Sequence, residues 1–594
     1  MGNAIWTTSV DRVKSGQNTS GIPNFLLAVA SAVILGATAI AVLGAVTVGA
    51  TWDERSLVRK LQNFFDSGWH TVAPLIDGVP DPDFFLGTYV YGPVGSLLPH
   101  LVNSALGGAE FLTTAPLTPD AYAGRHLGVV LWGVLGIAAA AGTVATIAKS
   151  WRWGIVGAAV LASTPLWTGH SMFNIKDTPA ATGYTLVTLG LVGLVDGDYF
   201  RSRRRHIISL GSLSVGLVIA IGTRTALFLP LVLTFIATWI FILLLRWRRP
   251  EAFGANTRIG RRVLEGLGAY VVAYVILVAI YPKAFLNPIQ VGVEAIFDSA
   301  LYPVNEAQLV AGNWLIQPVH WSYQPTWFAA QLPLLSLIPF LAFLIWWTAR
   351  ILQALAHPVS PATLGTVGQT LPVILQAVLV PLAAVVGSST LYNGTRQMLF
   401  VSPAIAILAT LGLYLLVRWR RVSAVPVVRI GVWALVALGL VIPTFVQFQL
   451  FPYGYTYFNA VTALRPIDGN WPTDYWRASG REILRNLPAG GRDSCGLEQL
   501  MRGELTPCTQ EPMFEPFLDE RGLDVRTVDL ADSEYWFIRE NSGPLEIPPG
   551  CREFTSITRP LFWRDVTIAQ IHICDDRIDT GLRNMADPTT ALPQ

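Results

Sequence analysis

Charged residues are scarce in this chain. Only 13% of its 594 residues are Asp, Glu, Lys or Arg, whereas soluble domains carry about 25%. Apolar residues fill the difference: they make up 52% of the sequence, and the mean hydropathy is +0.47. Many apolar runs reach the roughly 20 residues that a membrane-spanning helix needs. The composition excludes an ordinary soluble protein and predicts an α-helical polytopic membrane protein.

Several signatures of other functions are missing. The sequence has no Walker motif or other phosphate-binding glycine loop, and its arginine clusters do not form a nucleic-acid patch. The eight histidines lack the spacing of metal ligands. A divalent metal is therefore possible but not indicated, and no nucleic acid is expected as a partner.

Cysteine is rare and is confined to the last part of the chain. The four cysteines are Cys495, Cys508, Cys551 and Cys574. An even number in one soluble region predicts two disulfides and an oxidising compartment. Nearest-neighbour pairing, Cys495 with Cys508 and Cys551 with Cys574, is the simplest of three connectivities, and four unpaired cysteines are the alternative.

The same region differs from the rest in charge. Residues 450–594 contain 22 acidic and 14 basic residues, a net charge of −8, whereas residues 1–449 contain 17 and 27. We therefore expect a cytoplasmic arm at 1–21, a transmembrane domain at 22–449 and a small extracytoplasmic α+β domain at 450–594. In that last domain the sequence predicts a helix at 476–487 and strands at 535–538, 561–563 and 567–573.

Eleven apolar segments are predicted to cross the membrane. They lie at 22–50, 127–148, 154–172, 178–195, 207–223, 225–245, 263–281, 329–348, 370–387, 397–417 and 428–448. Basic residues gather in alternate turns between them, at Lys149, Arg201–Arg205, Arg246–Arg262, Arg350 and Arg418–Arg421. By the positive-inside rule these turns face the cytoplasm. Eleven spans then put the N-terminus inside and the C-terminal domain outside.

The first outer loop is predicted to contain helices that lie on the membrane surface. Apolar residues from Leu57 to Phe65 recur at helical spacing and form one stripe. The segment Val90–Leu106 is short and is interrupted by Pro93 and Pro99, which is typical of a second interfacial helix.

Two adjacent carboxylates, Asp53 and Glu54, follow the first apolar run. Ionisable groups at the membrane are costly and tend to be functional. Thr51 and Glu54 also fit a capping box, which would give Glu54 a structural role at a helix start. Asp53 has a weaker structural explanation and is the preferred catalytic base. We expect partial burial to raise its pKa from about 3.9 toward the range that suits a base.

Five more charged residues are predicted on the same outer side: Lys176, Asp177, Arg224, Lys283 and Arg396. Thr178 and Pro179 are expected to start the helix that follows them. Each cation could merely be a surface or snorkelling side chain. Outer cations nevertheless run against the cytoplasmic bias, which favours an anionic ligand. Carboxylates can deprotonate a hydroxyl and basic residues can neutralise a departing phosphate, which suits glycosyl transfer from a polyprenyl-phosphate sugar.

Five short pieces of sequence occur in a characteristic order over about residues 50–480. They are Asp53-Glu54, Lys176 to Pro179, His320 to Trp327, Tyr392 to Arg396, and Tyr457 to Asn459 with Asp474 to Trp476. Their order resembles that of the C-type (GT-C) membrane glycosyltransferases, in particular the protein O-mannosyltransferase and aminoarabinose-transferase group. One segment departs from this pattern, because Val90 to Val94 has a single proline where some relatives carry a charged Pro-Pro motif.

The resemblance, together with the charge pattern, implies a sugar transferase at the outer face of the cell membrane. Its donor would be a polyprenyl-phosphate sugar, its acceptor a hydroxyl of a cell-envelope glycan, lipid or protein, and its reaction would invert the anomeric centre. Catalytic roles fall to Asp53, Glu54 and Asp177, and binding of the donor phosphate to Lys176, Arg224, Arg396 and Lys283. An acceptor or lipid groove would include Tyr91, His320, Tyr323, Tyr392 and Asn393.

A polytopic transporter or lipid flippase with a soluble outer domain is the alternative. Transporters usually place charged groups near the bilayer midplane and show repeats or broken helices there. In this sequence the charges cluster at one interface, and no repeat is visible. A receptor-like or assembly protein would leave Asp53, Lys176 and Arg396 unexplained.

Overall fold

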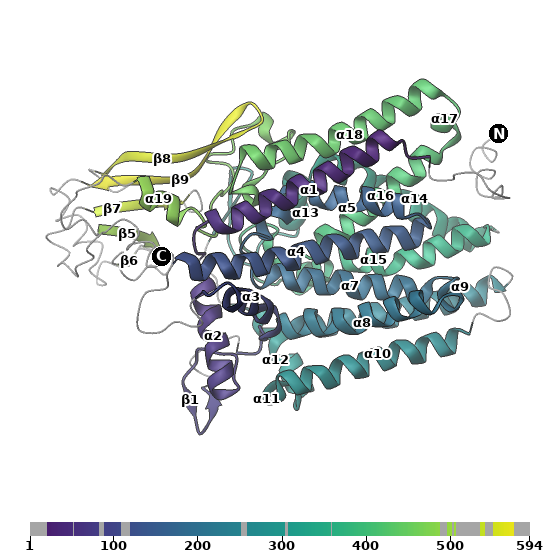
Figure 1. The fold of residues 1–594 in the computed structure, drawn as a ribbon, viewed down its shortest axis with the longest axis horizontal. Coiled ribbons are helices and arrows are strands. Elements are labelled where there is room, and N and C mark those ends of the chain that lie inside the picture. Colours follow the sequence, from purple (N-terminus) through teal and green to yellow (C-terminus); the bar gives the residue numbers. More distant parts are fainter. Residues whose placement is uncertain are drawn as a thin grey trace.

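Long apolar helices dominate the structure, which is a computed structural model (Figure 1). It describes residues 21–51, 53–81, 88–108, 119–250, 258–302, 307–357, 359–486, 496–501, 504–506, 535–540 and 551–574. Within these ranges ten helices are long and apolar enough to cross a membrane. They are α1 (Asn24–Thr47), α4 (Pro119–Ala148), α7 (Asp177–Val195), α8 (Arg203–Thr223), α9 (Phe228–Arg248), α10 (Ile259–Ile280), α14 (Leu334–Ala356), α15 (Pro361–Val386), α16 (Val401–Arg418) and α18 (Pro426–Gln449). The prediction of a multi-pass membrane protein is confirmed.

The predicted span at 154–172 is wrong as a single helix. The chain forms α5 (Trp151–Ala162) and α6 (Pro165–His170) instead. Thr164 between them has extended backbone angles, because the ring of Pro165 disfavours the helical conformation in the residue before it. The break lies inside the protein rather than against lipid, and the Ala162 carbonyl there accepts hydrogen bonds of 3.0 Å from the Gln447 side chain and the Thr168 hydroxyl. Such burial permits non-helical backbone at membrane depth.

Helices α5 and α6 together still carry the chain from one end of the bundle to the other. Lys149, just before α5, pairs with Asp196 at the C-terminal end of α7. Lys176, just after α6, pairs with Asp53 at the N-terminal end of α7. The 19 residues of α7 separate these two ends by about 28 Å at the usual helical rise. The described part of the chain therefore passes along the bundle eleven times, ten times as a long helix and once as the α5–α6 pair.

Helix α7 lies at the centre of the bundle and packs closely against α8 (Figure 1). Small residues permit this approach. A Cβ atom on Gly183 would lie 2.5 Å from the backbone nitrogen of Ala220, and one on Gly216 would lie 2.6 Å from that of Val187. Membrane helices depend on such small residues because lipid provides no hydrophobic force between them.

Short elements lie mainly at the end of the bundle that carries Asp53. Both predicted surface helices exist, as α2 (Glu54–Ser67) and α3 (Val94–Ala105). The other short helices are α11 (Pro282–Phe285), α12 (Pro288–Ala300), α13 (Tyr323–Gln331), α17 (Arg420–Ser423) and α19 (Gly480–Asn486). The 3-10 turns are η1 (Tyr199–Arg201), η2 (Thr225–Leu227), η4 (Arg396–Met398), η5 (Gly454–Thr456) and η6 (Thr462–Leu464). There are also two small hairpins: β1 (Leu75–Ile76) pairs with β2 (Val79–Pro80), and β3 (Gln308–Val310) pairs with β4 (Asn313–Leu315).

The C-terminal region forms a mixed five-stranded sheet at one end of the bundle, at the left of Figure 1. Its order is β6 (Glu504–Thr506), β5 (Gly496–Met501), β7 (Tyr535–Glu540), β9 (Arg564–Cys574) and β8 (Cys551–Leu561). Strands β5 and β7 are parallel and the other pairs are antiparallel. The predicted strands at 535–538 and 567–573 are confirmed. The one at 561–563 is wrong, because Phe562 and Trp563 form the turn of the β8–β9 hairpin.

One correction and one further observation concern the edges of this region. The helix predicted at 476–487 begins only at Gly480, because residues 471–479 form turns. The hydrophobic core also continues past the predicted domain boundary: Tyr457, Phe458 and Leu561 belong to the same buried cluster as the membrane helices.

The disulfides remain a prediction. Cys495 and Cys508 lie outside the described residues. Cys551 and Cys574 are directly opposed across strands β8 and β9. Opposed Cα atoms of an antiparallel pair lie about 4.5–5.5 Å apart, which is within the range that a disulfide spans. The backbone register thus supports the predicted pairing of these two residues.

Candidate active site

Asp53 is the point at which four separate segments of the chain meet. It lies between α1 and α2, and its Oδ2 atom receives three donors. These are Lys176 Nζ at 2.6 Å, Trp476 Nε1 at 3.0 Å and Arg396 Nη1 at 3.2 Å. A quarter of the Asp53 side chain is exposed, whereas the partners are buried. The carboxylate is thus held firmly through one oxygen while part of it faces open space.

A second ion pair lies beside the first. Asp177 Oδ1 is 2.6 Å from Arg224 Nη2, and its Oδ2 accepts a 3.0 Å hydrogen bond from Asn174. Helix α7 begins at Asp177, one residue before the predicted cap. Thr178 does not cap it, because its hydroxyl donates to the carbonyl of His170, while the side chain of Asn174 accepts the backbone N–H of Asp177. This local turn places Lys176 and Asp177 on the same side of the bundle.

A backbone bridge brings Tyr91 against these cations. The N–H of Gly92 donates to Thr223 O at 3.0 Å, and that of Thr225 donates to Val90 O at 3.2 Å. The Tyr91 ring centre is then 4.9 Å from Lys176 Nζ, while Lys60 and Arg224 approach it to 5.6 Å. Cations are attracted to the face of an aromatic ring, so the ring helps to keep three positive charges close together.

A tight turn just before Arg396 positions its side chain next to Asp53. Asn393 and Gly394 have positive φ angles of 56° and 67°, and the N–H of Gly394 donates to the Tyr323 hydroxyl at 3.0 Å. The Arg396 guanidinium lies 4.5 Å from the ring centre of Trp476 and 5.2 Å from that of Tyr392. Cation–π attraction to these two rings helps to hold the guanidinium in place.

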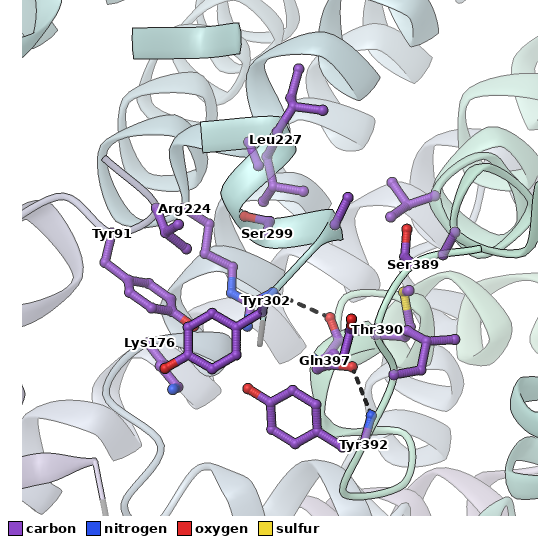
Figure 2. Close-up of a pocket in the computed structure, with 18 of the residues that line it drawn as sticks. Tyr91, Lys176, Arg224, Leu227, Ser299, Tyr302, Ser389, Thr390, Tyr392 and Gln397 are labelled. Atoms are coloured by element: carbon purple, nitrogen blue, oxygen red, sulfur yellow. Dashed lines mark hydrogen bonds between the residues drawn. The ribbon is translucent and has the colours of Figure 1, made fainter. Parts of the chain in front are cut away.

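Asp53, Tyr91, Lys176, Arg224 and Tyr392 line one end of a cavity of about 1050 Å³. Figure 2 shows the rings of Tyr91, Tyr302 and Tyr392 gathered around Lys176 and Arg224. Helix α2 adds Arg55, Arg59 and Lys60 to the same wall. The other end is apolar and is lined from η2, α9, α12 and α15 by Leu227, Leu229, Pro230, Ile296, Val380, Ala383 and Ala384. The cavity therefore has a cationic end and a hydrocarbon-like end.

The predicted rise in the pKa of Asp53 is wrong in sign. Burial alone would raise this pKa, but the positive charges of Lys176 and Arg396 and the hydrogen bonds from Lys176 and Trp476 lower it to about 2. Burial also lowers the pKa of Lys60, to about 8, and the charge of Lys176 contributes. Positive charge is thus crowded around Asp53, as expected of a place that receives an anion.

Glu54 does not line this cavity. It is 3% exposed, and its Oε2 accepts the N–H and hydroxyl of Thr51 at 2.6 and 2.9 Å. Its Oε1 lies 2.6 Å from His126 Nε2. The predicted capping box is therefore only half present, because α2 begins at Glu54 with Asp53 as the preceding cap residue. Glu54 joins the start of α2 to α4 and so supports the position of Asp53.

Besides Glu54, four predicted residues contact other parts of the protein. Lys283 donates to Ser67 O at 2.7 Å at the far end of α2. His320 is exposed and contacts Ser322, Tyr323 is fully buried behind the Asn393–Gly394 turn, and the N–H of Asn393 donates to Gln308. The remaining predicted residues, which are Asp53, Tyr91, Lys176, Asp177, Arg224, Tyr392 and Arg396, are brought together.

Sequence reasoning assigned no role to three residues of the site. Trp476 was part of a recognised motif, but nothing in the sequence shows that its indole reaches Asp53. Tyr302, which stacks on Tyr392 at 6.3 Å between ring centres, lies in a loop without a motif. His126, which contacts Glu54 from α4, belongs to no motif in the sequence. Within the described residues, no group of three or more His, Cys, Asp or Glu could hold a metal ion.

The fold and the site define a class: a multi-pass membrane protein with a charged cavity at one end of its helices. No protein-family model and no curated protein match the sequence. Two of the solved structures that are similar to this chain are of the same protein. One is ArnT from Cupriavidus metallidurans bound to undecaprenyl phosphate, with 15% identity, a TM-score of 0.45, and coverage of 92% of this chain and 98% of that one. The other is ArnT from the same organism in the apo state, with 13% identity, a TM-score of 0.45, and coverage of 96% of this chain and 99% of that one. At this level the likeness assigns no residue role and no substrate.

Proposed function

We propose that the chain is a membrane glycosyltransferase that moves a sugar from a polyprenyl-phosphate donor to an acceptor hydroxyl, with inversion at the anomeric carbon. The observation that carries this proposal is the single cavity in which a carboxylate, a group of cations and a long apolar wall meet. A lipid-linked phosphosugar has the complementary parts, namely a hydrocarbon tail, a phosphate and a sugar.

The donor phosphate is expected at Lys176, Arg224 and Arg396. Lys176 and Arg224 line the cationic end of the cavity, and Arg396 contacts Asp53, which also lines it, at 3.2 Å. Arginine recognises phosphate oxygens through a planar fork, and lysine acts as a point charge. The lipid tail would run along the apolar wall of α9 and α15, where Leu229 lines the cavity and is also 42% exposed.

Asp53 is expected to act as the general base in a single displacement. The acceptor oxygen attacks the anomeric carbon as its proton passes to Asp53, and the bond from that carbon to the phosphate oxygen breaks. The departing phosphate takes the electron pair and is neutralised by the cations rather than by a proton.

The low pKa of Asp53 in the protein without donor is compatible with this role, because donor binding changes the surroundings of the carboxylate. Lys176 and Arg396 both contact Asp53 Oδ2, so a phosphate that shares these cations weakens their hold on the carboxylate. The added negative charge also raises the pKa. The base therefore becomes stronger once the donor is in place. The acid limb of the pH profile should consequently lie higher for kcat than for kcat/KM.

Asp177 has a different geometry. It is 3% exposed, and Arg224 and Asn174 occupy both of its oxygens. It does not line the cavity, so it holds Arg224 in place for the phosphate rather than taking a proton.

The test is sugar transfer by membranes that contain matched variants. Asp53→Asn keeps the shape and removes the base, so turnover should fall by roughly 100-fold or more while donor binding persists. Asp177→Asn is the control for the second carboxylate and Glu54→Gln for the buried one, and both should lose less turnover. Wild-type transfer by Asp53→Asn, or a product that keeps the anomeric configuration of the donor, would refute the mechanism.

The transporter alternative predicts a different result. Membranes would then move a lipid or solute but transfer no radiolabelled sugar, from either polyprenyl-phosphate or nucleotide donors. The charged groups of the cavity lie at one end of α7, whereas transport sites usually lie near the midplane. Membrane orientation is a further part of the proposal: reporter fusions after Val422 and after Asn459 should report the cytoplasm and the outside, respectively.

A further inference from the structure

The segment Thr473–Arg481, which we call the strap, connects the C-terminal sheet to the catalytic carboxylate. Its first residue is held by the sheet. The hydroxyl of Thr473 lies 2.8 Å from Thr567 O and 3.1 Å from Ile568 O, both on strand β9. Thr473 is fully buried, so these carbonyls are its means of satisfying the hydroxyl.

The middle of the strap is closed by Asp474. This residue is 1% exposed, and it accepts the backbone N–H groups of Ala478 at 3.0 Å and Ser479 at 3.2 Å. The hydroxyls of Tyr455 and Ser479 also donate to it. A buried carboxylate with several donors fixes a turn firmly, and the turn presents the residue between these contacts, Trp476, toward Asp53.

Trp476 makes the contact that matters for the reaction. Its Nε1 donates to Asp53 Oδ2 at 3.0 Å, and its ring packs against Phe173 and His170 at 5.6 and 5.4 Å between centres. Arg396 lies on the same ring. An indole N–H has a fixed direction, so together with Lys176 and Arg396 it holds the carboxylate through Oδ2.

The end of the strap is hydrogen-bonded to the C-terminal end of α1 and to the residues just after it. The N–H of Gly49 donates to Ala478 O at 3.0 Å, and Arg481 Nη1 donates to Val46 O at 3.0 Å. A Cβ atom on Gly49 would lie 2.9 Å from both Ala478 O and the backbone nitrogen of Arg481, so only glycine fits here. Asp53 follows Gly49 by four residues and is thereby positioned from both its backbone and its side chain.

Resting on the proposed function, we infer that Thr473 is a positioning residue through which the C-terminal sheet sets the indole of Trp476 against the base. The sheet is itself held in place by contacts with the segment that precedes it. Thr567 binds Asp468, and Arg559 binds Glu482 and the Phe451 carbonyl, all in the segment between α18 and the sheet. The sheet is then a structural part of the active site rather than an appended domain.

The experiment uses the full-length protein with Thr473→Val, Thr473→Ser and Trp476→Phe. Thr473→Val removes the hydroxyl at nearly constant volume, so kcat should fall about 10-fold or more, because a small misplacement of a catalytic group has effects of that size. The KM for the donor should stay within about 2-fold. Thr473→Ser retains the hydroxyl and should restore kcat. Rates are normalised to the amount of donor-binding protein, which removes any contribution from poor folding.

A double-mutant cycle identifies the route of the effect. If Thr473 acts through Trp476, Trp476→Phe combined with Thr473→Val should be no slower than Trp476→Phe alone. Wild-type kcat in Thr473→Val, no rescue by serine, or fully multiplicative losses would each overturn the inference. These outcomes are distinct from failure of the proposed function, in which the wild-type protein itself transfers no sugar.

Discussion

Arg396→Ala should weaken binding of the polyprenyl-phosphate donor more than it slows the chemical step. Arg396 is 3% exposed, lies near the rings of Trp476 and Tyr392, and places Nη1 3.2 Å from Asp53 Oδ2. Its charge cannot be replaced by solvent, so a bound phosphate would lose a charge-assisted hydrogen bond. Such a bond contributes about 1.5–3 kcal/mol, which corresponds to a Kd about 10- to 150-fold higher.

Protonation of the base does not account for the effect. Arg396 is one of the charges that lower the pKa of Asp53 to about 2. Even a full return to the ordinary value of about 3.9 would leave Asp53 ionised at pH 7. The loss at neutral pH must therefore come from the missing contact with the donor phosphate. Arg396→Lys keeps the charge but lacks the planar fork, so its Kd should fall between those of wild type and Arg396→Ala.

The assay is equilibrium binding of radiolabelled donor to the purified protein in detergent. Lys283→Ala is the matched control, because the sequence grouped Lys283 with the phosphate ligands whereas the structure pairs it with the Ser67 carbonyl. Its donor Kd should remain within about 2-fold of wild type. An unchanged Kd in Arg396→Ala, or an equal loss in Lys283→Ala, would refute the assignment of the phosphate site.

Three further predictions concern stability and covalent structure. The pKa of Asp53 in the folded protein is lowered to about 2, so its ion pairs stabilise the fold above the unfolded pKa of about 3.9 and lose this effect as the pH falls toward 2. The difference in melting temperature between wild type and Asp53→Asn should therefore shrink below pH 4. A difference that stays constant with pH would contradict this prediction. Gly92→Ala should lower the free energy of unfolding by about 1–3 kcal/mol, because its Cβ atom would lie 2.4 Å from Gly222 O. Gly211→Ala is the control, since its Cβ atom meets open space and stability should not change. Equal melting curves for the two variants would contradict this prediction. Non-reducing peptide mapping should find Cys551 linked to Cys574, whose Cα atoms are opposed in the sheet, and four free thiols would exclude it.

Apolar run length and the placement of charge were sufficient to predict most of the membrane fold. Both are local properties of the chain, so ten of the eleven spans and both surface helices follow from them. The break at Thr164–Pro165 could also be read locally, but whether a broken crossing is tolerated depends on burial by neighbouring helices. Charges at the ends of apolar runs likewise pointed to Asp53, Lys176, Arg224 and Arg396.

Only the tertiary structure decided which of these charges meet. Lys176 and Lys283 look alike in sequence, yet one binds Asp53 and the other a carbonyl at the far end of α2. The sign of the Asp53 pKa shift depends on whether burial or neighbouring cations dominate, and this is set by distances of a few ångströms between residues hundreds of positions apart. The same holds for Trp476, 423 positions from Asp53. Sequence patterns record what each residue can do, whereas long-range packing decides which partner it has, because a charge or hydrogen bond acts only over short distances.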